Sequence, residues 1–367
     1  MKKKRHPHEE PSSPLVIFLG AGASVEAGLP ISTGITGHLI EQMEEQSETE
    51  LLEMIRFICD KLTTGRSGQP VDIELLLRTA TYLADRNVDP LIESNANPLP
   101  KFVTSWCEEL QSIDPAGDGV LFRRLLREAK SLLPRILQPT KSVKYLSEIN
   151  RLMNAVPTRK RFAPVVFTLN YDLCLEQALN DANIKFTTGF EKGVWTPSAL
   201  ANPRIIRLFK LHGSLGWVRH PERRIIYDAY DSAQSDEILV ESPEINHEII
   251  FAIDNKLQAT QPFLWLFQQC AEIVSRSSYI VCIGYSFRDD HVNEIIGQAM
   301  ASDPSKHLIF VSPTASEQTL EHVRGITFFP KRVLPIKGTA RPVLSGTRIQ
   351  TKLEQAENKQ RVEEPFK

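Results

Sequence analysis

Four short clusters of glycine and polar residues follow directly after apolar runs. They are Gly20-Ala21-Gly22, Asn170-Tyr171-Asp172, His212-Gly213-Ser214 and Gly284-Tyr285-Ser286. Two glycines within three residues permit a tight turn and a close approach of bare backbone, which favours a phosphate group. Any one cluster alone is typical of a helix cap or of a structural histidine. Four clusters in one chain indicate a ligand site that includes a phosphate-binding turn.

The elements before these clusters read as strands of one sheet. The apolar run at residues 15–19 has the composition of a strand buried on both faces. From residue 164 onward, apolar strands alternate with amphipathic helices, and the segment 216–228 has the pattern of a hairpin. This alternation predicts an α/β fold with a doubly wound, mostly parallel sheet. Because ligands bind at the carboxyl ends of such strands, the four clusters are expected to meet at one edge of the sheet.

Other parts of the chain predict the domain organisation. Residues 1–13 have the composition of a disordered basic tail. Apolar residues at three-to-four spacing predict an inserted helical module at about residues 36–156, within a domain that covers residues 14–335. Residues 336–367 are polar and weakly periodic, which predicts a C-terminal tail or a partner-binding arm.

Composition and charge exclude several classes of protein. With 367 residues the chain can bury a full core, and its net charge of −2 provides no overall attraction to nucleic acid or to an anionic membrane. Five scattered cysteines without a Cys-x-x-Cys pair argue against a zinc module and favour a cytoplasmic location. No apolar segment has the length needed to span a bilayer.

Taken together, the clusters resemble the motifs of the sirtuin family over roughly residues 14 to 315. The matching residues are Gly20, Ala21, Gly22, Ser24, Gly28 and Pro30 in the glycine-rich signature, Thr168, Asn170 and Asp172 in the Thr-Gln-Asn-x-Asp motif, His212 and Gly213 in the His-Gly pair, and Gly284 and Ser286 in the Gly-Thr-Ser motif. Leu169 replaces the family's glutamine. The resemblance implies a Rossmann-like sheet that binds NAD as a substrate, and cleavage of the bond between nicotinamide and ribose.

The resemblance also implies roles for individual residues. Asn170 would hold the nicotinamide ribose or an attacking water, Asp172 would face the carboxamide, and His212 would be the base near the ribose hydroxyls. Eight further matches would bind the cofactor: Gly20, Ala21, Gly22, Ser24, Pro30, Thr168, Gly284 and Ser286. Of these, Ala21 and Gly22 would approach the pyrophosphate through backbone N–H groups, and Ser286 would contact the adenosine.

The departures from the family pattern narrow the expected activity. Sirtuin deacylases carry a four-cysteine zinc module, which this sequence lacks, and Ile31-Ser32 replaces the Phe-Arg pair after the loop proline. The pattern is more similar to bacterial sirtuin-like NAD hydrolases of antiviral defence. Those proteins contain a segment that resembles residues 284–293 of this chain. We therefore expect an NAD hydrolase that needs no metal, forms a homo-oligomer and is controlled by assembly or by a partner. A ring-forming HerA-like ATPase or an Argonaute-like protein is the kind of partner that the resemblance implies.

Three alternatives stay open at this point. A protein deacylase or ADP-ribosyltransferase would share the same motifs. A sensor of NAD or of an NAD-derived signal would need neither Asn170 nor His212. A nicotinamide-dependent dehydrogenase fits less well, because Val25 occupies the third glycine position of its fingerprint.

Overall fold

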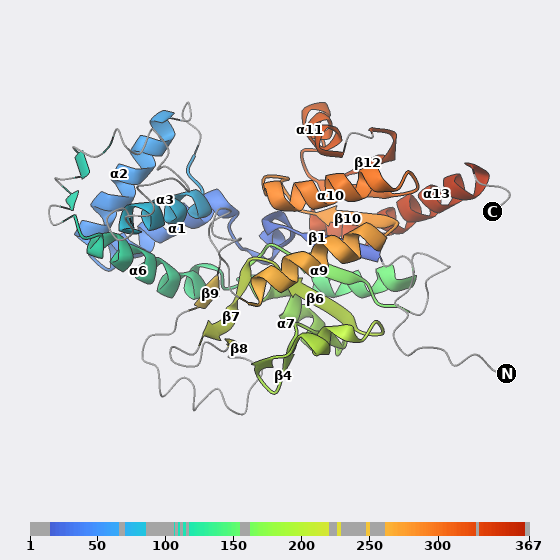
Figure 1. Ribbon diagram of the computed structural model, residues 1–367, viewed down its shortest axis with the longest axis horizontal. Coiled ribbons are helices and arrows are strands. Elements are labelled where there is room, and N and C mark those ends of the chain that lie inside the picture. Colours follow the sequence, from blue (N-terminus) through green and yellow to red (C-terminus); the bar gives the residue numbers. More distant parts are fainter. Residues whose placement is uncertain are drawn as a thin grey trace.

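The computed structural model describes residues 15–65, 70–85, 106, 109–110, 113–114, 117–154, 162–219, 226–228, 247–249, 261–327 and 330–363. The predicted basic tail at residues 1–13 lies outside this part of the chain. Figure 1 shows two lobes, one built around a sheet and one built from helices.

A seven-stranded parallel sheet forms the centre of the larger lobe. Its strand order is β12-β11-β10-β1-β2-β6-β3, and every pair of neighbouring strands runs parallel. The strands are β1 (Leu15–Leu19), β2 (Val165–Thr168), β3 (Phe186–Thr187), β6 (Ile206–Lys210), β10 (Tyr279–Ile283), β11 (His307–Ser312) and β12 (Val333–Lys337). The prediction of a mostly parallel α/β sheet is confirmed.

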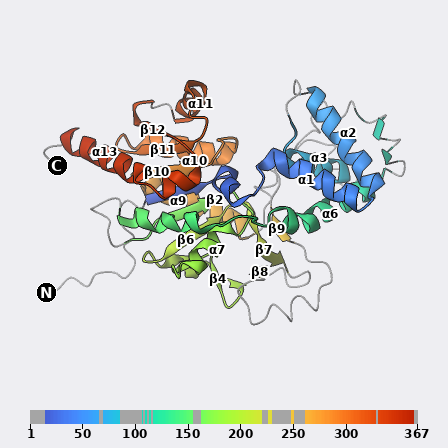
Figure 2. The same cartoon turned by 180° about the vertical axis from the view of Figure 1, so that it is seen from behind.

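Helices cover both faces of this sheet because its central strand is apolar on both sides. Along β1, Val16 and Phe18 pack into the cluster that includes α9 and α10, whereas Ile17 packs into the cluster that includes α7 and α13. Figures 1 and 2 show these two sets of helices on opposite sides of the sheet. The helices are α7 (Cys174–Asp181), α9 (Phe263–Arg276), α10 (Asp290–Ser302), α11 (Glu317–Thr327), α12 (Ala340–Leu344) and α13 (Arg348–Glu363).

A smaller antiparallel sheet extends the larger lobe. Its strand order is β4-β5-β8-β7-β9, and the strands are β4 (Phe190–Glu191), β5 (Val194–Trp195), β7 (Gly213–Arg219), β8 (Ile226–Asp228) and β9 (His247–Ile249). The predicted hairpin at residues 216–228 is present as the antiparallel pair β7 and β8. Because only two residues separate β6 from β7, His212 lies where the chain passes from one sheet to the other.

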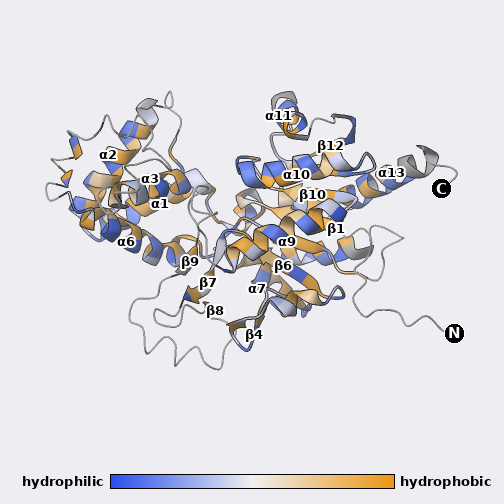
Figure 3. Cartoon of the chain, viewed as in Figure 1, coloured by the Kyte–Doolittle hydropathy of each residue, from blue (hydrophilic) through white to orange (hydrophobic). Residues whose placement is uncertain are grey.

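Among the described residues, four helices form the second lobe, which we call the helical lobe. They are α1 (Ser32–Glu45), α2 (Thr49–Gly65), α3 (Ile73–Asp85) and α6 (Val120–Ile136). The 3₁₀ helix η3 (Lys144–Asn154) follows and packs against α7. In Figure 3 these helices carry polar and apolar residues side by side, as amphipathic helices do when they bury one face.

The C-terminal segment forms two helices. Residues 340–344 form α12 and residues 348–363 form α13, and Val343, Ile349 and Leu353 are fully buried. A C-terminal tail or partner-binding arm at residues 336–367 stays a prediction. Helix α13 is polar over most of its length, and its buried apolar residues Ile349, Leu353 and Ala356 attach it to the core around the sheet. Among the described residues, no helix is long and apolar enough to cross a membrane.

Candidate functional site

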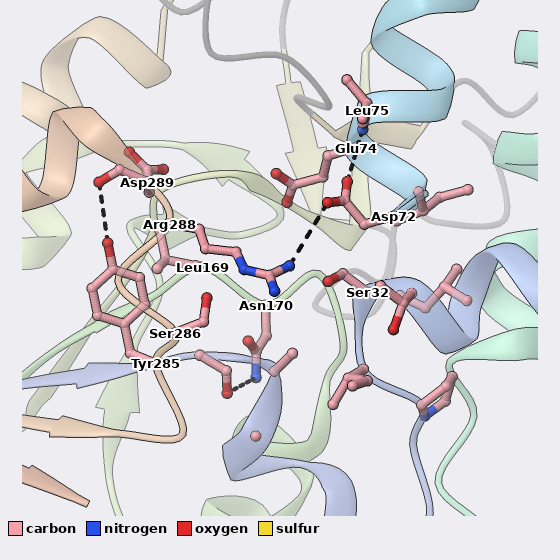
Figure 4. Close-up of a pocket in the computed structure, with 18 of the residues that line it drawn as sticks. Ser32, Asp72, Glu74, Leu75, Leu169, Asn170, Tyr285, Ser286, Arg288 and Asp289 are labelled. Carbon is pink, nitrogen blue, oxygen red and sulfur yellow. Dashed lines mark hydrogen bonds and ion pairs between the residues drawn. The ribbon is translucent and has the colours of Figure 1, made fainter. Parts of the chain in front are cut away.

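A cleft of about 1600 Å³ lies between the carboxyl edge of the parallel sheet and the helical lobe. Strand order explains its position, because the chain moves to one side of β1 through β2 and to the other side through β10. In doubly wound sheets, ligands bind at such a switch point. Figure 4 shows residues of both lobes facing each other across the cleft.

The structure brings nearly all of the predicted site residues to this cleft. Its walls include Gly20, Ala21, Gly22, Ser24, Pro30, Asn170, Asp172, His212, Gly284 and Ser286. Thr168 is the exception, because it is buried behind the wall. Its Oγ1 accepts a hydrogen bond from the backbone N–H of Asn170 (3.1 Å), so Thr168 helps to fix the backbone at that site residue.

The glycine-rich turn after β1 is packed against the turn after β10. The N–H of Gly22 donates to the carbonyl of Gly284 (2.9 Å), and the N–H of Gly20 donates to the carbonyl of Ile283 (3.1 Å). A Cβ on Gly20 would lie 2.6 Å from the Gly284 oxygen, and one on Gly22 would lie 2.8 Å from the Gly284 Cα. Contact between the two turns therefore requires glycine at positions 20 and 22. The N–H of Gly22 is already hydrogen-bonded to the Gly284 carbonyl. Two short 3₁₀ turns follow, and the first long helix, α1, begins only at Ser32.

Asn170 has a fixed side-chain orientation. Its Nδ2 donates to the carbonyl of Gly20 (3.1 Å) and to Ser24 Oγ (3.2 Å). The amide nitrogen is thus engaged by the glycine-rich turn, which leaves the amide oxygen as the side-chain atom available to a ligand.

His212 is buried between carboxylates from the two lobes. Its Nε2 lies 2.8 Å from Asp289 Oδ2, and its Nδ1 lies 3.7 Å from Oε1 of Glu74 on α3. Tyr171 donates from its hydroxyl to the same Glu74 oxygen (3.0 Å). Burial, followed by the nearby Glu74 charge, raises the pKa of Tyr171 well above its usual range. The phenol therefore stays protonated and remains a donor to Glu74.

Asp172 has structural contacts in addition to its place in the cleft wall. Its Oδ1 accepts from the backbone N–H of Cys174 at the beginning of α7 (3.0 Å). Its carbonyl accepts from the buried Lys210 Nζ (2.6 Å), which also donates to Glu176 Oε1 (2.7 Å). These contacts fix the turn between β2 and α7.

An ion pair between Arg288 and Asp72 crosses the cleft. Arg288, in the segment between β10 and α10, lies 4.0 Å from Asp72 at the beginning of α3. In Figure 4 the Arg288 side chain extends past Asn170 toward Asp72. Asp72 Oδ1 also accepts from the backbone N–H of Leu75 (2.9 Å), so the carboxylate is held in place.

Sequence reasoning missed four residues with contacts at this site: Asp72, Glu74, Arg288 and Asp289. Arg288 and Asp289 fall within the segment 284–293 that was singled out, but their partners are distant in sequence. Asp72 and Glu74 lie in the helical module, where no local pattern distinguishes them from surface carboxylates. Within the described residues, no group of three His, Cys, Asp or Glu side chains could hold a metal ion.

A family model matches part of the larger lobe. Residues 164–328 match the family model of the SIR2-like domain. This range contains Asn170, His212 and Ser286 but neither the glycine-rich turn nor the helical lobe. No curated protein matches the chain.

Among solved structures, 108 chains match. One comes from a study of the mechanism and regulation of Sir2 enzymes, with 14% identity, 95% of each chain covered and a TM-score of 0.40. Another is a Sir2 homologue in complex with NAD, with 14% identity, 93% of this chain and 90% of that chain covered, and a TM-score of 0.42.

Proposed function

We propose that the protein binds NAD in the cleft and hydrolyses the bond between nicotinamide and ribose, giving nicotinamide and ADP-ribose. The observation that carries the proposal is the meeting of Asn170 and His212 beside the glycine-rich turn, at the switch point of the sheet. The match of residues 164–328 to the SIR2-like domain supports NAD as the ligand class.

The proposed reaction uses the two side chains in different ways. The bond between ribose C1′ and the nicotinamide nitrogen breaks, its electron pair leaves with the neutral nicotinamide, and the ribose develops oxocarbenium character. A water held by the Asn170 amide oxygen then adds to C1′. His212 faces the ribose hydroxyls and accepts the proton that the water loses.

Product analysis tests this proposal against its alternatives. We expect purified protein with NAD to yield ADP-ribose and nicotinamide without an added acceptor, as measured by chromatography. Turnover that depends on an acetylated peptide and forms an O-acylated ADP-ribose would favour a deacylase instead. NADH formation would indicate a dehydrogenase, and NAD binding without products would indicate a sensor.

Two variants connect the reaction to the named residues. Asn170→Ala and His212→Ala are each expected to lower turnover about 100-fold or more, as for loss of a positioned acid–base group. Asn202→Ala is a matched control, because Asn202 is exposed. In the described part of the chain, its side chain makes one hydrogen bond, which it accepts from the backbone N–H of Arg204. Near-normal turnover in folded His212→Ala would leave His212 with a structural role only.

We further propose that the activity depletes NAD in antiphage defence, under the control of a homo-oligomer or of a partner such as a ring-forming ATPase or an Argonaute-like protein. An uncontrolled NAD hydrolase would poison its own cell, so the free protein should be inhibited or incomplete. Light scattering combined with turnover across protein concentration tests this control. A monomer with full, concentration-independent activity and no response to any partner would contradict it.

A further inference from the structure

The segment 284–293 forms a turn that is held by its own hydrogen bonds. The Tyr285 hydroxyl donates to Asn293 Oδ1 (2.9 Å), and it also lies 3.2 Å from the carbonyl of Asp289. Asn293 Nδ2 donates to the carbonyl of Phe287 (2.9 Å), whose φ of 55° is in the left-handed region. These contacts fix the backbone at Asp289 before any ligand binds.

The two carboxylate oxygens of Asp289 have separate partners. Oδ1 accepts from the backbone N–H of Val292 (3.1 Å) and so caps the beginning of α10. Oδ2 lies 2.8 Å from His212 Nε2. Only 7% of Asp289 and 3% of His212 is exposed to solvent, so water competes little for this contact. A capping aspartate needs only one of its oxygens for the helix, and here the second oxygen is directed at the imidazole.

We propose that Asp289 is a positioning residue that holds His212 with its proton on Nε2 and with Nδ1 directed toward the Glu74 side of the cleft. An ionised carboxylate can only accept, so the nitrogen beside it must be the donor. Nδ1 is then the nitrogen left to accept a proton from a ribose hydroxyl or a water. The role in turnover rests on the proposed NAD hydrolysis, whereas the position of the proton does not.

Two substitutions separate positioning from capping. Asp289→Asn keeps the shape and a good N-cap, but its amide can donate to Nε2 and so favour the other tautomer. Asp289→Ser also caps α10 but is too short to keep the present contact with His212. Glu294→Gln is the matched control, because Glu294 is an exposed carboxylate on the same helix, bonded to Gln298 and outside the cleft wall.

The first measurement is ¹⁵N NMR of histidine-labelled full-length protein, with the His212 signals assigned from their loss in His212→Gln. We expect a protonated Nε2 in the wild type and in Glu294→Gln, and a changed Nε2 and Nδ1 pattern in Asp289→Asn. Unchanged His212 nitrogen signals in a folded Asp289→Asn protein would overturn the proposal. This readout needs no NAD turnover, so it can succeed or fail independently of the proposed function.

The second measurement is steady-state turnover with NAD. We expect kcat to fall about 100-fold or more in Asp289→Asn and Asp289→Ser with a small change in KM, as when the carboxylate that orients a catalytic histidine is replaced. Thermal unfolding close to that of the wild type would show that capping is retained. A kcat within about twofold of the wild type in both variants would reduce Asp289 to a helix cap.

Discussion

At the residue scale, the contact between Glu74 and His212 joins two parts of the chain that are far apart in sequence. Glu74 comes from α3 of the helical lobe, and 37% of its side chain is exposed to solvent. Its carboxylate accepts from Tyr171 and lies on the Nδ1 side of the imidazole. A carboxylate in this place can stabilise positive charge that develops on a bound ribose.

Glu74→Gln tests this electrostatic role. A glutamine oxygen can still accept from Tyr171, so the substitution removes mainly the charge. We expect kcat for NAD hydrolysis to fall roughly 10- to 100-fold. A carboxylate a few ångströms from a developing positive charge stabilises that charge by on the order of 1–3 kcal/mol in a partly solvated site. Glu53→Gln, an exposed change on α2 of the same lobe, should leave kcat unchanged. Equal rates for the two variants would show that Glu74 has no electrostatic part in turnover.

At the element scale, backbone contact between the turns after β1 and β10 shapes the floor of the cleft. Sequence reasoning assigned the glycines to the close approach of a pyrophosphate. The structure adds a second reason, because each glycine meets the backbone of the opposite turn.

Gly22→Val is therefore expected to lower the unfolding temperature as well as to weaken NAD binding. The added Cβ would lie 2.8 Å from Gly284 Cα and force the turns apart. Gly37→Ala is the contrasting change, because Gly37 lies inside α1 with nothing within 4 Å of an added Cβ. It should stabilise the protein by up to about 1 kcal/mol. Calorimetry of unfolding and of NAD binding would measure both effects. An unchanged unfolding temperature for Gly22→Val would contradict the packing argument.

The pair Arg288 and Asp72 also connects two elements, the turn before α10 and the beginning of α3. Arg288 is 69% exposed, so the ion pair contributes only about 0–1 kcal/mol and can break easily. We expect Arg288 to exchange Asp72 for the diphosphate when NAD binds.

The two partners should then change NAD affinity in opposite directions. Arg288→Gln is expected to raise the Kd for NAD about tenfold, as for loss of one charge-assisted hydrogen bond. Asp72→Asn keeps the acceptor for Leu75 and frees Arg288, so the Kd should fall or stay the same. Calorimetric titration measures both values, and a rise in Kd for both variants would indicate a pair that only supports the fold.

At the scale of the whole molecule, the C-terminal helices attach to both the sheet and the glycine-rich turn. Arg341 donates to the carbonyl of Glu26 (2.8 Å), just after that turn. Its guanidinium also stacks on Tyr145 (5.0 Å to the ring centre), whose hydroxyl donates to the carbonyl of Ala23 (2.6 Å). The last described helices thus support the turn that carries the first cluster of site residues.

Truncation after Lys337 should consequently destabilise the protein. It removes α12 and α13 and uncovers the sheet surface beneath Val343, Ile349 and Leu353. Leu353→Ala alone is expected to cost about 2–5 kcal/mol, as for other buried leucines. Truncation after Glu363 is the control, because it leaves both helices in place. If the chain that ends at Lys337 unfolds at the temperature of the full chain, the segment is a dispensable arm, as its composition suggested.

The sequence by itself determined the parallel sheet and the residues that its strand ends contribute to the cleft wall. Apolar strands alternate with amphipathic helices, and the carboxyl ends of parallel strands lie along one edge. Asn170, His212 and Gly284 each lie within two residues of the end of a strand, so they had to meet there.

Only the tertiary structure decided which groups surround His212. Asp289 and Glu74 are 77 and 138 positions from His212 in the sequence, and no local period connects them. The helical lobe brings Glu74 to the cleft through packing between helices, and a few buried side chains attach the mostly polar α13 to the sheet. Local patterns report which face of an element is apolar, whereas contacts between distant elements depend on how those faces pack together.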